Sequence, residues 1–259
     1  IPFSDNERVI TIGPISKDVK YIDCSYETKL GNMLEGKATG DIYEDLMVFS
    51  GEDVLLFPFI NEEDFDSISR YIDQITIEVQ TKDDWNSVIP FQQNICESNK
   101  VTIKKPNWHV LYNLAKSCYA FGKFECLPIN TIDKTFDFFV DAAYKHKLTS
   151  ENVTTMSNIY NYYVQVFGEG LEDYPVVLLR SEESQGLPIL GGVGGKSMGI
   201  SFEMKTGEDW YTFSRTLYHA FFDSKIHARN LHFPPNLWLY KGLAEYYVDK
   251  SASVIPANV

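Results

Sequence analysis

Two side chains that can bind a metal or move a proton stand four residues apart in the sequence Y-H-A-F-F-D-S-K-I-H, residues 218–227. At that spacing His219 and Asp223 share one face of a helix, because an α-helix completes a turn every 3.6 residues. Zinc hydrolases use two histidines at this spacing, with a glutamate after the first as general base. Here that position holds Ala220, which cannot move a proton. The pattern has the spacing of a metal site and only part of its chemistry.

A glycine cluster, G-G-V-G-G-K-S, occupies residues 191–197 and suggests a phosphate-binding loop. Such a loop requires G-x-x-x-x-G-K-[ST] between a strand and a helix. Counting back from Gly195, the first glycine would have to stand where the chain has Leu190, and the segment that follows, M-G-I-S-F, is typical of a strand. We therefore reject nucleotide binding.

Strand-like segments dominate the first part of the chain. They are short, rich in β-branched and aromatic residues, and separated by glycines. They cover residues 9–12, 21–26, 45–49, 53–59 and 74–80. This pattern predicts a β-sandwich-like N-terminal domain over residues 1–97. The polar segment 98–108, which contains Pro106, is the expected boundary region.

From residue 98 to residue 259 we expect a second, mixed domain, so that the whole chain belongs to the α+β class. Apolar residues at helical spacing predict four helices, and two apolar runs predict strands. The expected helices cover 132–148, 150–167, 208–222 and 237–249, and the expected strands cover 174–180 and 198–202. The small sheet formed by these strands should pack against the last two helices.

Charge and hydropathy exclude several classes of partner. The 259 residues carry a formal net charge of −13, which disfavours a nucleic acid or an anionic lipid surface. No stretch approaches the ~18 consecutive apolar residues of a membrane-spanning helix. The chain starts at Ile1 without a basic and apolar leader pattern, which slightly favours the cytoplasm, although a leader already removed is an alternative.

Four cysteines are spaced without a C-x-x-C pair, and we expect reduced, mostly packed thiols rather than a disulfide framework. They are Cys24, Cys96, Cys118 and Cys126.

The segments T-L-Y-H-A-F-F-D and L-W-L-Y-K-G-L-A-E-Y-Y, residues 216–223 and 237–247, resemble the glycyl aminopeptidase family. These thermolysin-like zinc peptidases, or gluzincins, have an N-terminal β domain. The family usually carries H-E-x-x-H, then L-W-x-x-E-G-x-x-x-Y-Y, and G-G-L-E-H-x-x-S on the strand beside the substrate cleft. Residues 191–197 correspond to the last motif, and residues 44–58 look like the entry to the core of the β domain. The resemblance implies a thermolysin-like fold for residues 98–259.

The residues at the expected zinc-ligand positions depart from the family. The resemblance assigns His219 to the first ligand, Asp223 to the second and Lys241 to the third, where a cation replaces an anion. A metal-free site must satisfy these groups in another way. We therefore expect no bound cofactor, and a salt bridge between Lys241 and Asp223, direct or through one water, with His219 within hydrogen-bonding reach.

The positions that should face substrate are also changed. The glutamate and histidine of the family's glycine motif become Gly194 and Gly195, and Gly192 and Ser197 are the remaining substrate-facing positions. For three nearby residues we expect ordinary roles rather than metal binding: His227, His232 and Glu245.

Two functions of different classes follow from the resemblance. The first is a pseudo-peptidase whose former cleft serves assembly or binds a peptide or small molecule. The second is a metal-independent enzyme that uses the surviving polar groups, and an active zinc aminopeptidase is the third alternative. The resemblance also implies a further helical domain after the helix that contains Trp238, so we expect a partner chain to cover the C-terminal side, unless the chain is truncated.

Overall fold

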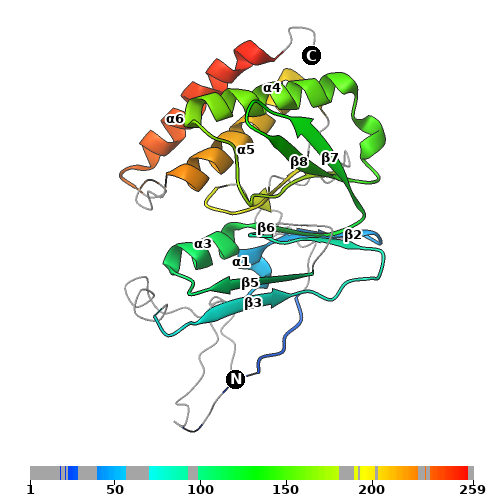
Figure 1. The fold of residues 1–259 in the computed structure, drawn as a ribbon, viewed down its shortest axis with the longest axis vertical. Helices are drawn as coiled ribbons and strands as arrows, with labels where there is room; N and C mark the ends of the chain where they lie inside the picture. The colour runs from blue at the N-terminus through cyan, green and yellow to red at the C-terminus, as the bar shows by residue number, and fades with distance from the viewer. Residues whose placement is uncertain are drawn as a thin grey trace.

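The structure is a computed structural model that describes residues 18, 21, 23–28, 40–56, 70–92, 99–180, 190–191, 193–201, 204–226, 231 and 234–255. It is an α+β fold in which two small sheets lie below a larger sheet and its helices (Figure 1). Among the described residues no helix is long and apolar enough to cross a membrane.

Two antiparallel sheets make up the lower part of the molecule. The four-stranded sheet has the order β1 (Gly40–Ile42), β2 (Leu46–Ser50), β6 (Cys118–Gly122) and β4 (Asn86–Val88), and β3 (Gln74–Glu78) pairs with β5 (Lys100–Lys104). Helices α1 (Gly51–Val54) and α3 (Trp108–Lys116) lie beside them. A core of five buried side chains joins the two sheets: Phe49, Ile89, Val101, Tyr119 and Phe121.

Some of the expected N-terminal strands differ from the structure. The segment predicted over 53–59 begins in the short helix α1, and the described residues 21 and 23–26 are in no strand. The segment at 9–12 lies outside the described residues.

The larger sheet does not begin at the predicted domain boundary, residue 97. Strand β5 lies in the polar segment that suggested a linker, but it pairs with β3 over five residues. Its exposed and buried residues alternate, so the polar side chains belong to the solvent face of a strand. Strand β6 then returns between β2 and β4. The chain passes from the two lower sheets to the larger sheet only at Lys123, the single residue between β6 and β7 (Phe124–Asn130).

A five-stranded mixed sheet forms the upper part. Its order is β10 (Leu190–Gly191), β11 (Met198–Ser201), β9 (Val176–Leu179), β8 (Thr135–Asp141) and β7. Strands β8, β9 and β11 are parallel, and the two edge strands are antiparallel to their neighbours. The strands predicted at 174–180 and 198–202 are thus confirmed as direct neighbours.

The helix predicted over residues 132–148 is instead strand β8. Phe136 and Val140 are four apart, as a helix requires, but Phe138 is buried with them while Asp137 between them is exposed. This is the two-residue period of a strand. Phe139 faces the opposite side of the sheet and joins a different core cluster.

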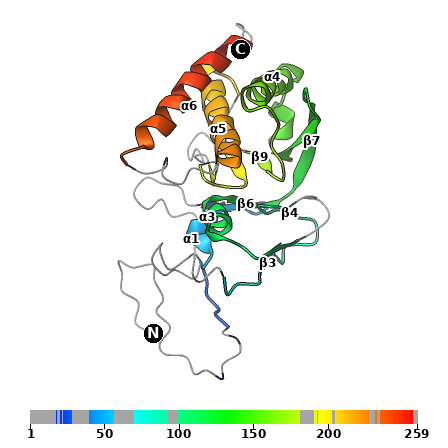
Figure 2. The same cartoon turned by 60° about the vertical axis from the view of Figure 1, so that its left-hand side comes forward.

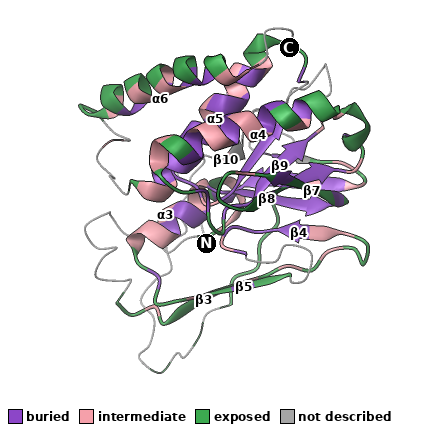
Figure 3. Ribbon diagram, turned by 45° about the horizontal axis from the view of Figure 1, so that its top comes forward, coloured by how far each residue is buried: buried purple, intermediate pink, exposed green. Residues whose placement is uncertain are grey.

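The other three predicted helices are confirmed, as α4 (Ser150–Phe167), α5 (Gly207–Lys225) and α6 (Leu237–Ser251). Capping boxes start two of them. The Thr149 side chain accepts a hydrogen bond from the N–H of Asn152, and the Thr206 side chain accepts one from the N–H of Asp209. In return, the Asn152 and Asp209 side chains each accept a hydrogen bond from the backbone N–H of their threonine. Helices α4 and α5 cover one face of the large sheet, and α6 lies on the outer side of α5 (Figures 2 and 3). The helix that contains Trp238 therefore packs mainly on α5, and the Trp238 side chain is 71% exposed.

The other face of the large sheet packs on the four-stranded sheet. Nine buried side chains form this shared core: Leu46, Val48, Val88, Cys118, Ala120, Phe124, Phe139, Val177 and Leu179. The first five come from the four-stranded sheet and the last four from strands β7, β8 and β9 of the large sheet. The two parts of the chain are therefore layers of one hydrophobic structure.

The described cysteines are free thiols, as expected, but only one of them is packed. Cys118 is buried, whereas Cys24 and Cys126 are exposed, and Cys96 lies outside the described residues.

Candidate functional site

His219 and Asp223 lie on one face of α5, as their spacing predicted, and both are buried, with 8% and 5% of their surface exposed. Ala220 is turned by about 100° from His219 and about 60° from Asp223 and belongs to the core between α5 and the sheet. The residue after His219 is thus a packing residue.

The Asp223 carboxylate is held by two donors from different segments. Its Oδ2 accepts a 2.7 Å hydrogen bond from the backbone N–H of Gly194 and a 2.9 Å bond from the hydroxyl of Tyr240 on α6. Hydrogen bonds to an ionised, buried carboxylate are stronger than those between neutral groups. Asp223 therefore connects α5 both to α6 and to the glycine cluster at residues 191–197, hereafter the glycine loop.

The surroundings of Asp223 change the acidity of two phenols. Burial raises the pKa of Tyr240 far above its usual value, and the negative charge of Asp223 adds to this effect. Burial and then the same carboxylate also raise the pKa of Tyr174, two residues before β9. Both hydroxyls stay protonated at neutral pH and are suited to donate hydrogen bonds.

The His219 imidazole stacks on the Tyr240 ring, with ring centroids 4.9 Å apart and planes inclined by 25°. The Tyr218 ring meets the imidazole edge to face at 5.6 Å. His219, Asp223 and Tyr240 thus form one compact cluster of imidazole, carboxylate and phenol between α5 and α6.

The glycine loop contributes backbone groups to this cluster. Gly194 has a φ of +74°, and a Cβ there would lie 2.5 Å from a ring carbon of Tyr112 on α3. While the Gly194 N–H reaches Asp223, its carbonyl oxygen accepts a 2.8 Å bond from the Asn113 side chain. Only glycine suits this position, because the backbone is left-handed and α3 approaches closely.

Two other predicted substrate-facing residues also dock the loop onto the lower part. A Cβ at Gly195 would lie 2.6 Å from the carbonyl oxygen of Lys116. The Ser197 hydroxyl, fully buried, donates a 2.5 Å bond to the carbonyl oxygen of Cys118. Gly192 lies outside the described residues. In this structure, Gly194, Gly195 and Ser197 face α3 and β6.

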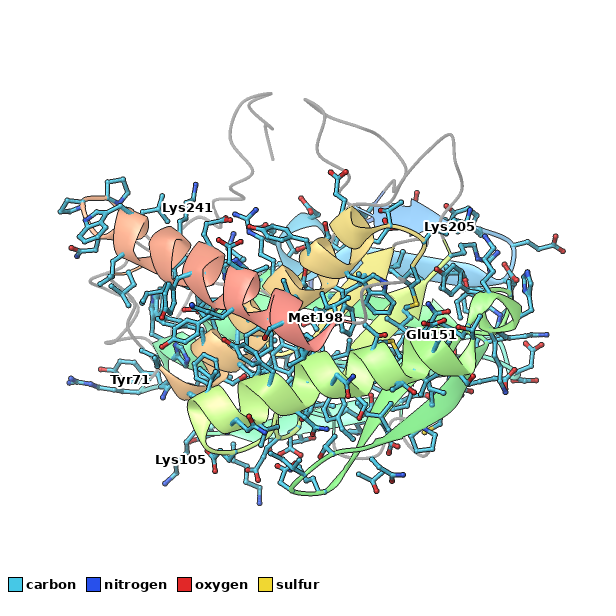
Figure 4. All side chains as sticks on the ribbon, turned by 90° about the horizontal axis from the view of Figure 1, so that it is seen from above. Tyr71, Lys105, Glu151, Met198, Lys205 and Lys241 are labelled. Carbon is cyan, nitrogen blue, oxygen red and sulfur yellow. The ribbon has the colours of Figure 1, made fainter. Side chains whose placement is uncertain are left out.

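The structure shows no direct ion pair between Lys241 and Asp223, and the form bridged by one water stays a prediction. Lys241 is exposed, and it takes part in no ion pair within the described part of the chain. Figure 4 shows its side chain at the outer edge of the molecule, near the start of α6. The preceding residue, Tyr240, faces α5 and reaches Asp223 in its place. One residue turns a helix by about 100°, so both side chains cannot face α5.

The residues for which we expected ordinary roles divide into two groups. Glu245 accepts hydrogen bonds from the Tyr211 hydroxyl and, at 3.0 Å, from Arg215, and so joins α6 to α5. His227 and His232 lie outside the described residues.

Sequence reasoning missed Tyr240, although a signal for it is present. Tyr240, Ala244 and Val248 are spaced four apart and are the buried positions on the inner face of α6. This spacing of buried residues predicts that Tyr240 faces α5 and that Lys241 does not. The role of Asn113 has no such signal, because its contact with Gly194 spans 81 residues.

Comparison with known proteins supports the fold and leaves the family open. No family model and no curated protein matches this chain. Among solved structures, it is similar to an aminopeptidase N family protein from Idiomarina loihiensis, with a TM-score of 0.56 and 11% sequence identity. The match covers 82% of this chain and 38% of that one, so this chain spans well under half of the neighbour's length. At this identity the similarity concerns the fold.

The zinc ion implied by the resemblance to gluzincins does not fit these residues. Besides His219 it would use Asp223, whose Oδ2 is already held by Gly194 and Tyr240, and Lys241, an exposed cation. Structural and catalytic zinc sites need three or four nitrogen, sulfur or carboxylate ligands from the protein. In the described ranges no group of three or more His, Cys, Asp or Glu side chains is placed to hold a metal ion.

Proposed function

We propose that this chain is a catalytically degenerate relative of the glycyl aminopeptidases, in which the former active-site region serves binding or assembly. In this proposal the lower sheets correspond to the family's N-terminal β domain, and the large sheet with α4, α5 and α6 corresponds to its thermolysin-like domain. The ligand is a peptide or small molecule, or the partner is a chain that covers the C-terminal side.

The observation that carries the proposal is the contact of Tyr240 with both Asp223 and His219. The Tyr240 hydroxyl donates to Asp223, at the second ligand position of the resemblance, and the Tyr240 ring stacks on His219, at the first. The phenol and the backbone N–H thus donate hydrogen bonds to a carboxylate that, in the proposed active relatives, would bind zinc. With Ala220 in place of the base, no residue of this cluster activates water.

The alternative, a metal-independent enzyme, is less well supported by the same residues. A general acid or base works best with a pKa near the working pH. Burial and Asp223 move the pKa of Tyr240 strongly away from that range. The cluster is better suited to hold three segments together than to transfer protons.

Metal analysis combined with a hydrolysis assay tests the proposal. The natively purified chain should contain well under one zinc ion per molecule and should not cleave glycyl or alanyl p-nitroanilide, with or without added zinc. Loss of both metal and base removes water activation, and a general base alone is worth about 10²–10⁴-fold in rate. Stoichiometric zinc in the wild type, with cleavage that a chelator abolishes, would overturn the proposal.

A further inference from the structure

A second candidate site is a cleft of about 610 Å³ at the edge where the lower and upper sheets meet. Its lining comes from three places: the turn between β1 and β2, the segment before β4, and the residues Lys123 and Arg180 that flank the large sheet. Its volume is within the range of small-molecule sites. Unlike most of these, its lining is rich in charged groups of both signs.

Two carboxylates fix the Arg180 guanidinium, one of the lining groups of the cleft. Arg180 donates from Nε and Nη2 to Asp141, at 2.5 and 3.0 Å, and from Nη1 and Nη2 to Asp45, both at 3.0 Å. The Arg180 side chain is 17% exposed and lies over the ring of Tyr43 at 5.2 Å. Asp45 is thereby oriented, while 45% of its side chain remains open to solvent.

Among the lining residues, the Lys82 ammonium lies over the aromatic ring of Trp85. The Lys82 ammonium lies 4.7 Å from the centre of the Trp85 ring and donates a 2.6 Å bond to the backbone oxygen of Glu44. An ammonium has three N–H donors, and within the described part of the chain no carboxylate forms an ion pair with Lys82. Lys82 and Trp85 therefore present a positive charge next to an apolar ring in the lining of the cleft.

The lining also contains an exposed ion pair that a ligand can displace at little cost. Lys123 and Asp84 form a 2.6 Å ion pair, but 53% and 61% of their side chains are exposed. Exposed pairs of this kind contribute little to stability. A ligand that offers a charge to each partner replaces the pair without leaving either charge unmatched.

We propose that this cleft binds a small zwitterion, namely a free amino acid or a short peptide with both ends unblocked. The ligand carboxylate would lie between Lys82 and Lys123, its ammonium would face Asp45 and Asp84, and its side chain would contact Trp85. A neutral sugar would offer hydroxyl hydrogen bonds to these groups but no charge of its own to match them. A ligand with a net negative charge would meet three carboxylates, those just named and the exposed Glu44.

This cleft is separate from the cluster around Asp223. Tyr174, which feels the charge of Asp223, precedes β9, and Arg180 directly follows it. Arg180 is six residues after Tyr174, which corresponds to about 20 Å in an extended chain. The inference does not depend on the proposed function, and the failure of either leaves the other standing.

Calorimetric titration of the full chain with five probes tests the inference. L-leucine and L-leucylglycine carry both charges, L-leucinamide lacks the carboxylate, N-acetyl-L-leucine lacks the ammonium, and D-glucose is the neutral control. We expect saturable binding of the first two, with each blocked form at least about tenfold weaker because it loses a charge-assisted hydrogen bond. The tighter of the two zwitterions identifies the source as a free amino acid or a peptide. No saturable binding of either, blocked forms that bind equally well, or tighter binding of glucose would overturn the inference.

Two matched variants locate the binding to this cleft. Lys123→Gln should weaken zwitterion binding about fivefold to tenfold. Lys100→Gln is the control, because Lys100 is also 53% exposed and paired with a carboxylate, Glu78, on a strand outside the cleft. Thermal melting of both variants checks that they are folded. Equal affinities of the two variants would place any observed binding elsewhere and contradict the inference.

Discussion

The side chain of Asn113 donates a 2.8 Å hydrogen bond to the carbonyl oxygen of Gly194, 81 residues later in the chain. The N–H of the same glycine donates to Asp223, and Asp223 also accepts from Tyr240. One buried path of hydrogen bonds thus runs from α3 through the glycine loop to α5 and α6. The positions that resemble a peptidase site form a joint between four segments, and the first predictions concern this joint.

Removing the Asp223 carboxylate should destabilise the fold strongly. In Asp223→Ala the Gly194 N–H and the Tyr240 hydroxyl both lose their acceptor, and each unsatisfied buried donor costs about 1–3 kcal/mol. Urea unfolding should therefore show a loss of about 2–5 kcal/mol. Tyr240→Phe, which removes one of the two donors, should lose less. Equal stability of Asp223→Ala and the wild type would show that the joint does not hold the fold.

Lys241 should contribute almost nothing to stability. Because its side chain is exposed and in no described ion pair, we expect Lys241→Ala to change the free energy of unfolding by less than about 0.5 kcal/mol. The comparison with Tyr240→Phe is direct, since the two residues are neighbours on α6. A loss of several kcal/mol in Lys241→Ala would contradict this expectation and support an ion pair between Lys241 and Asp223.

Two glycine-to-alanine substitutions should have opposite effects. Gly194→Ala places a Cβ 2.5 Å from the Tyr112 ring in a left-handed backbone, so we expect a loss of at least about 1–3 kcal/mol. Gly242→Ala on α6 meets nothing within 4 Å and should gain about 0.5–1 kcal/mol from helix propensity. Thermal unfolding of the two variants measures both effects, and a neutral Gly194→Ala would contradict the close approach of α3 to the loop.

The stability that Asp45 provides should depend on pH. The hydrogen bond from Arg180 lowers the pKa of Asp45 in the folded chain. A lowered pKa means that the contribution is complete above the unfolded value of about 3.9 and is lost as the pH falls through the folded value. Asp45→Asn should therefore be less stable than the wild type near neutral pH, and the difference should shrink below about pH 4.

Urea unfolding of Asp45→Asn and the wild type across acidic pH measures this difference. Asp137→Asn is the control, because Asp137 is an exposed carboxylate of β8 that takes part in no ion pair of the described residues. A difference for Asp45→Asn that stays constant through acidic pH would contradict the role of Arg180.

The thiols should separate by reactivity. Burial raises the pKa of Cys118 far above its usual value, so little reactive thiolate forms there. Cys126 is exposed on β7. Labelling of the native chain with a thiol reagent, followed by peptide mass mapping, should modify Cys126 and spare Cys118 until the chain unfolds. Fast native labelling of Cys118 would contradict the packing of the two sheets on each other.

How much of this structure follows from the sequence depends on the range of the interactions. Helices α4, α5 and α6 were predicted because their apolar spacing is a local property of the sequence. Strand β8 was taken for a helix because Phe136 and Val140 suit both periods, and only the exposed Asp137 decides between them. The sheet to which β6 belongs is a long-range property, set by pairing with β2 some 70 residues earlier.

The site shows the same division. The shared face of His219 and Asp223 followed from their spacing, whereas the direct partner of Asp223 on α6 is Tyr240, one residue before the predicted Lys241. The prediction took Lys241 from a motif frame, and the buried phase of α6 points to Tyr240 instead. Charge also favoured this outcome, because a phenol is buried beside a carboxylate at a lower desolvation cost than an ammonium.

Lys123 alone connects the four-stranded sheet to the five-stranded sheet, and nine buried side chains seal the space between them. A single residue is too short to serve as a hinge, so the layers have no room to swing apart. Residues 124–259 produced alone would expose the apolar underside of the large sheet to water and would tend to aggregate. The two layers should accordingly melt in one transition, and neither can be exchanged for a homologous module without rebuilding the other.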